Sequence, residues 1–181
     1  MADVSGCYPS AVQWPLVGHS GAGLLADKKL IVLHITAGAT AESAVETFKA
    51  SVAPHRVSAH FVIEQDGAVY QLLPVSDVAW HAAECNRRSV GIEHVGIPGR
   101  LPCTEEQYAA SALLVRWLCD ALKIPCDRKH ILTHNEASPA DGHVLCCTGA
   151  LNPDRVVAQA ITRCCAKGQA GKCMQTVGWK K

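Results

Sequence analysis

The stretch that decides the fold is residues 30–38, which read LIVLHITAG. Its first four residues, Leu30 to Leu33, are apolar and branched, which indicates a short strand buried on both faces. The small residues around Gly38 indicate the turn that ends this strand. His34 therefore stands at the exit of a buried strand, where α/β proteins tend to place their chemistry.

Patterns typical of strands and of helices alternate along the rest of the chain. Further strands are predicted over residues 57–63, 68–72, 89–95 and 130–134. Helices are predicted over residues 41–51 and 104–122 and from residue 152 onward. Asp66-Gly67 lies between two apolar runs and predicts a hairpin. We therefore expect an α/β fold, a single domain with a mixed central β-sheet flanked by helices.

Length and composition limit the function classes. The chain has 181 residues, of which 49% are hydrophobic and 18% charged, so it is globular and long enough for one core. We expect an N-terminal segment packed on the core over residues 1–28, a catalytic domain over 29–167 and a flexible basic tail over 168–181. A net charge of +1 argues against a nucleic-acid partner. No apolar stretch approaches the roughly 20 residues of a membrane span.

Residues that commonly ligate metals follow two of the predicted strands. His134 ends the strand at residues 130–134 much as His34 ends the first. The polar loop over residues 135–151 contains the adjacent pair Cys146-Cys147. Two imidazoles and a thiolate form a known type of catalytic zinc site. The sequence therefore predicts a zinc site at the strand ends.

The order of several motifs resembles that of type-2 N-acetylmuramoyl-L-alanine amidases, zinc enzymes related to phage lysis amidases and to peptidoglycan-recognition proteins. The resemblance covers about residues 29–166. The matching motifs are LIVLHITAG at 30–38, VSAHFVI at 57–63, DG at 66–67, AWHA at 79–82, SVGIE at 89–93 and ILTHNE at 131–136. This similarity implies hydrolysis of the amide between N-acetylmuramic acid and the L-alanine of the stem peptide.

The resemblance also implies roles for particular residues. The zinc (Zn²⁺) ligands would be His34, His134 and Cys147, with Cys146 as the rival for the third position. Glu93 occupies the position of the family's catalytic glutamate and would act as the general base. His143 is the nearest candidate in the loop for stabilising the oxyanion, because Leu145, two residues before Cys147, has no suitable group.

The expected substrate is peptidoglycan or a soluble muropeptide. His60, Trp80, His81 and Asn86 are candidates to line its binding groove, Trp80 through its apolar face. The alternative function is a module of the same fold that binds peptidoglycan without cleaving it. Loss of the third zinc ligand would favour that alternative, whereas this chain carries two cysteines at that place.

The setting in which the protein acts is left open by the sequence. The N-terminus, MADVSG, does not have the basic and apolar regions of a signal peptide. We expect synthesis in the cytoplasm, with release by a holin or a secretion system as one route to the cell wall. A phage endolysin, a recycling enzyme and an injected effector all fit. We expect a monomer whose ten cysteines are mostly reduced.

Overall fold

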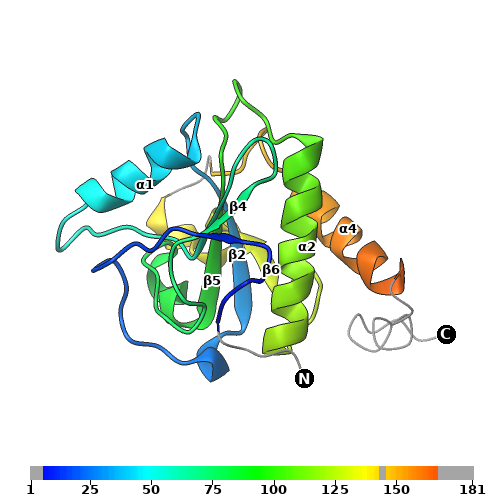
Figure 1. Cartoon of the computed structure of the whole chain (residues 1–181), viewed down its shortest axis with the longest axis horizontal. Helices are drawn as coiled ribbons and strands as arrows, with labels where there is room; N and C mark the ends of the chain where they lie inside the picture. The colour runs from blue at the N-terminus through cyan, green and yellow to red at the C-terminus, as the bar shows by residue number, and fades with distance from the viewer. Residues whose placement is uncertain (1–5, 143–145, 167–181) are drawn as a thin grey trace.

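The computed structural model describes residues 6–142 and 146–166. Its centre is a six-stranded sheet with the strand order β1-β4-β3-β5-β2-β6 (Figure 1). The strands are β1 (Val12–Gln13), β2 (Leu30–Ile35), β3 (Phe61–Ile63), β4 (Val69–Gln71), β5 (Ser89–His94) and β6 (Ile131–Thr133). Among these described strands only the β3–β4 pair is antiparallel, so the sheet is mixed, as the sequence predicts.

Helices cover both faces of the sheet. The α-helices are α1 (Ala41–Ala50), α2 (Glu105–Leu122), α3 (His134–Ala137) and α4 (Pro153–Ala166). Short 3₁₀ helices are η1 (Leu25–Asp27), η2 (Ala83–Arg88) and η3 (Pro139–Asp141). The long helices α2 and α4 lie side by side on one side of the sheet, and α1 lies on the other (Figure 1). Among these helices, none is both long and apolar enough to cross a membrane.

Strand β2 is buried on both faces because its alternate residues pack against different elements. Ile31 and Leu33 belong to the core cluster that contains Leu118 of α2 and Val156 of α4. Val32 packs in a separate cluster on the opposite face, with residues of η2 and α3. Each fully buried aliphatic side chain stabilises the fold by about 1.5–3 kcal/mol. The apolar run therefore places this strand inside the sheet, between β5 and the edge strand β6.

Local sequence signals set the other elements. Thr104 caps α2 in a capping box with Gln107, as the residues TEEQ predict. Gly67 adopts a φ of 85° in the turn between β3 and β4, as the Asp-Gly signal predicts. Asn152 accepts a hydrogen bond from the Arg155 backbone N–H at the start of α4.

The N-terminal segment contributes to the sheet itself. Its strand β1 pairs with β4 in parallel, a pairing that the segment's lack of periodicity did not predict. Lys28 is fully buried, and its ammonium donates a hydrogen bond to the Ser89 carbonyl at 3.1 Å. The basic tail expected over residues 168–181 lies outside the described residues.

His60, which directly precedes β3, is a buried neutral histidine. Its Nδ1 accepts a hydrogen bond from the Gly91 backbone N–H at 3.0 Å, which leaves Nε2–H to donate to the Asp77 carbonyl at 3.1 Å. Burial lowers the pKa of His60 to about 3, and the nearby Lys28 ammonium contributes to the shift. The folded protein therefore keeps this ring uncharged at mildly acidic pH.

We expect the free energy of unfolding to decrease as the pH falls below 6.5. Below this pH His60 is protonated in the unfolded chain but stays neutral in the folded protein. The stabilisation is therefore complete above 6.5, the ordinary pKa of histidine, and is lost as the pH falls toward about 3, the pKa of His60 in the folded protein. At pH 5 this one residue accounts for about 2 kcal/mol. Urea denaturation at pH 7 and pH 5 measures the difference.

The variant His60→Gln should lose that part of the pH dependence. The matched control is His55→Gln, because His55 is exposed and should leave the pH dependence unchanged. Equal pH dependence in His60→Gln and the unsubstituted protein would contradict the expectation.

Candidate metal centre

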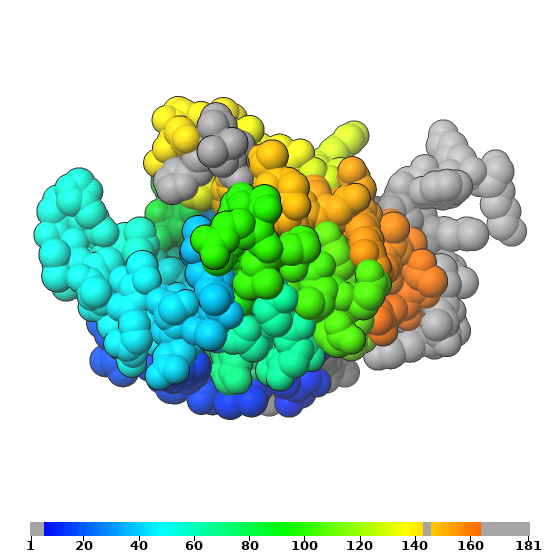
Figure 2. Space-filling view, turned by 90° about the horizontal axis from the view of Figure 1, so that it is seen from above, coloured from blue at the N-terminus to red at the C-terminus, as the bar shows by residue number. Residues whose placement is uncertain are grey.

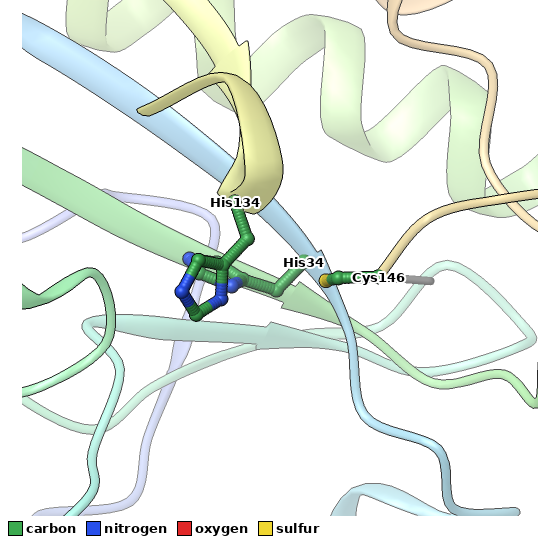
Figure 3. A group of neighbouring side chains, drawn as sticks. All are labelled: His34, His134 and Cys146. Carbon is green, nitrogen blue, oxygen red and sulfur yellow. The ribbon is translucent and has the colours of Figure 1, made fainter. Parts of the chain in front are cut away.

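Three ligand-type side chains gather at the carboxyl ends of β2 and β6. They are His34, His134 and Cys146, and one ligand atom from each lies within 4.8 Å of the others (Figure 3). His34 is the penultimate residue of β2, and His134 opens α3 directly after β6. Cys146 comes from the loop that leads to α4. The fold therefore brings His34 to two residues that follow it by 100 and 112 positions in the sequence.

The pairing of the strands explains why these side chains meet. In the parallel ladder His34 stands opposite Glu93 of β5, and Leu33 stands opposite Thr133 of β6. His134 therefore enters the site one position beyond the last β6 pair. Parallel strands place their carboxyl ends at the same edge, where ligands commonly bind.

The structure groups Cys146 with the two histidines, whereas the side chain of Cys147, the residue expected as the third ligand, lies elsewhere. The Cys147 thiol is buried and donates a hydrogen bond to the Leu33 carbonyl at 3.2 Å, toward the core. Cys147 also has a φ of 71°, in the left-handed region, so the backbone turns sharply there. The side chain of Cys146 consequently faces the cavity, and that of Cys147 packs in the core.

The surroundings of Cys146 favour its thiolate. Its pKa lies well below the ordinary value, first because of the adjacent Cys147 thiol, whose sulfur is 3.7 Å away. The rings of His134 and His34 lower it further, and burial opposes the shift. The pKa of Cys147 is raised by the same pairing and by burial. Since the thiolate is the form that binds metal ions, Cys146 is the better ligand of the two.

Glu93 lines the same cavity and carries an unsatisfied carboxylate oxygen. Its Oε2 is buried and has no hydrogen-bond partner among the described residues. Burial raises the pKa of Glu93 to about 7; the His34 and His134 rings oppose that rise, and Cys146 adds to it. A buried oxygen without a partner is unfavourable unless a ligand completes its bonding. The carboxyl group is therefore suited to exchange a proton with a bound molecule.

Both histidine rings are held through their Nε2 atoms. Nε2 of His34 lies 2.9 Å from Nδ1 of His81, and Nε2 of His134 lies 2.9 Å from a carboxylate oxygen of Asp141. The backbone of His34 is held as well, because His94 donates Nδ1–H to its carbonyl at 3.0 Å. No local sequence motif marks the contact of Asp141 with His134.

The cavity over these residues has a volume of about 490 Å³. Its outer wall includes Arg56, whose guanidinium lies 5.8 Å from the centroid of the Trp80 ring. Asp141 also lines the cavity. Figure 2 shows the chain that follows α1 (cyan) projecting at the left, with a notch between it and residues 135–142 (yellow). The surface of the molecule is therefore hollowed between these two segments.

Three of the four residues predicted to contact substrate line the cavity, and the fourth is buried. Trp80, His81 and Asn86 line the cavity, although the Asn86 side-chain oxygen already accepts hydrogen bonds from the backbone N–H groups of His81 and Ala82. His60 does not line it, since the ring is fully buried with both nitrogens bonded, and the expectation of a substrate contact there is corrected. His143, predicted to stabilise the oxyanion, lies outside the described residues.

The sequence of this chain is similar to those of known amidases. The chain is 34% identical over 108 residues to the 1,6-anhydro-N-acetylmuramyl-L-alanine amidase AmpD of Escherichia coli (strain K12), a match that covers 55% of this chain and 57% of AmpD. It is 39% identical over 79 residues to AmpD of Salmonella typhimurium (strain SL1344), covering 39% of this chain and 42% of that protein. The chain thus spans about half the length of the curated relatives it matches.

Solved structures share the fold. A crystal structure of an AmpD derivative matches with a TM-score of 0.69 at 23% identity, covering 85% of this chain and 96% of that one. The amidase LysC from Clostridium intestinale URNW matches with a TM-score of 0.70 at 20% identity, covering 84% and 97%. The sequence model of the family described as N-acetylmuramoyl-L-alanine amidase matches residues 25–148, more than half of the chain. This chain belongs to the N-acetylmuramoyl-L-alanine amidase family.

Proposed function

We propose that this protein is a zinc-dependent hydrolase that cleaves the amide between N-acetylmuramic acid and the L-alanine of the peptidoglycan stem peptide. The observation that carries the proposal is the grouping of His34, His134 and Cys146 beside Glu93 in one open cavity of a family member. The curated relatives are named as amidases of 1,6-anhydro-N-acetylmuramyl-L-alanine. A structural relative, AmiD, is described in complex with an anhydro-N-acetylmuramic acid peptide.

The residues present fit a zinc ion. Two imidazole nitrogens and one thiolate are ligands that zinc prefers, and three protein ligands leave a fourth position for a water molecule or substrate. The lowered pKa of Cys146 provides the thiolate at neutral pH. When bound, zinc would polarise the scissile carbonyl and lower the pKa of a water molecule.

Glu93 supplies the proton transfers that amide hydrolysis requires. Its carboxylate would accept a proton from the attacking water and then deliver that proton to the nitrogen of the leaving L-alanine. The C–N bond breaks, leaving a carboxylate on the lactyl group and a free amino group on the peptide. A pKa of about 7 is suited to both steps, since the group then exchanges protons readily near neutral pH.

The products test the bond that is cleaved. We expect incubation with a soluble anhydro-muropeptide or with intact sacculi to release peptides that begin with L-alanine, identified by their masses. Comparison of the two substrates shows which size of substrate the cavity accepts. Products cut within the glycan or within the peptide would contradict the proposal, and so would tight binding of sacculi without any cleavage.

The third ligand is tested by exchanging each cysteine alone. We expect one zinc ion per chain, and we expect Cys146→Ser to weaken zinc binding by about 100-fold or more, because removal of a direct ligand costs at least as much as removal of its support. Chelator competition measures the affinity. The matched variant Cys147→Ser should retain zinc but melt at a lower temperature, because it alters a buried thiol. Unchanged zinc affinity in Cys146→Ser would exclude it as a ligand.

The general base is tested by Glu93→Gln. We expect this variant to retain zinc while kcat falls by about 10²–10⁴-fold, the usual contribution of a general base. In the unsubstituted protein kcat/KM should rise as the pH increases through about 7, because only the ionised carboxylate accepts a proton. The control is Glu46→Gln, which alters an exposed carboxylate on α1. An unchanged kcat in Glu93→Gln would contradict the assignment.

A further inference from the structure

A chain of hydrogen bonds links His34 to the protein backbone through His81. Nε2 of His34 lies 2.9 Å from Nδ1 of His81, and Nε2 of His81 lies 3.1 Å from the Ser89 hydroxyl. That hydroxyl donates to the Cys85 carbonyl at 2.7 Å. The planes of the His34 and His81 rings are almost perpendicular, at 84°, and the ring centroids lie 5.1 Å apart.

The direction of each hydrogen bond in this series follows from the last one, between Ser89 and the Cys85 carbonyl. A carbonyl only accepts, so the single proton of Ser89 is committed to Cys85. The Ser89 oxygen must then accept a proton from Nε2–H of His81. A neutral His81 that is protonated at Nε2 presents a lone pair at Nδ1. His34 therefore donates from Nε2–H, and its own lone pair is at Nδ1.

The surroundings of His81 fix the position of its ring. A Cβ atom added at Gly91 would lie only 2.7 Å from the ring, so a glycine on β5 is what allows the ring to lie against the strand. The backbone N–H of His81 donates to the Asn86 side-chain oxygen at 2.9 Å. Residues of one short segment thus place His81: Asn86 holds its backbone, Ser89 bonds its ring, and Gly91 leaves room for that ring.

We propose that His81 is a positioning residue that sets the tautomer of His34, so that Nδ1 of His34 is the atom that binds the metal ion. This inference rests on the proposed zinc function and replaces the expectation that His81 contacts substrate. Metal-bound histidines usually donate their second N–H to a carboxylate, a carbonyl or water. At His134 the acceptor is the carboxylate of Asp141, whereas at His34 it is the imidazole of His81.

Two variants separate this role from simple packing. His81→Ala removes the acceptor for His34, whereas in His81→Asn the amide oxygen stands at about the position of Nδ1 and can accept the same proton. We expect His81→Ala to weaken zinc binding by about 10–100-fold, as loss of a supporting partner does. We expect His81→Asn to recover most of that loss. His55→Ala alters an exposed histidine of the same cavity and should leave the zinc affinity unchanged.

The tautomer itself is measured without any metal. Two-bond ¹H–¹⁵N spectra of the histidine-labelled, metal-free protein should show His34 protonated at Nε2. In Ser89→Ala and His81→Ala we expect His34 to populate both tautomers, a change that a packing defect alone would not produce. A His34 ring protonated at Nδ1 in the unsubstituted protein would overturn the inference.

The zinc measurement distinguishes failure of the inference from failure of the proposed function. If the unsubstituted protein binds zinc and His81→Ala binds it with the same affinity, the positioning role is wrong while the zinc function stands. If the unsubstituted protein binds no zinc, the proposed function fails, and with it the consequence of the tautomer for metal binding. Retained folding of His81→Asn, checked by thermal denaturation, keeps the comparison interpretable.

Discussion

The site depends on the parallel pairing of β2 with β5 and β6. This pairing places Glu93 beside His34 and brings His134 to the same edge of the sheet. Burial of Ile31 and Leu33 against α2 and α4 fixes the register, because a slip of one residue would turn those side chains away from the core and His34 toward the helices. The packing that stabilises the fold thus also sets the distances between the candidate ligands.

The fold is largely predictable because its signals are local. A run of branched apolar residues predicts β2, the Asp-Gly step predicts the hairpin, and the capping box predicts the start of α2. The strand β1 escaped prediction because its two residues, Val12 and Gln13, are both exposed and show no alternation. Its place at the sheet edge is set by pairing with β4, which no nearby residue indicates.

The site is predictable in its residue types and less so in its contacts. The motifs that contain His34, His134 and Glu93 identify these residues, because each follows or lies within a recognisable strand. The choice between two adjacent cysteines depends on the backbone turn at Cys147, which the sequence does not specify. The contact of His34 with His81 joins residues 47 positions apart and depends on how the loop before β5 folds over Gly91.

His34 is held from opposite sides of the sheet, its ring by His81 and its carbonyl by His94. The ring nitrogen of His94 that does not bond to His34 accepts a hydrogen bond from Ser111 of α2, on the core side. The rotational freedom of this side chain is therefore lost when the chain folds, before any ligand arrives. Immobilising such a side chain during binding would cost about 0.5–1.5 kcal/mol. Ligand affinity is consequently coupled to the integrity of the hydrophobic core, so substitutions in α2, remote from the cavity, can change it.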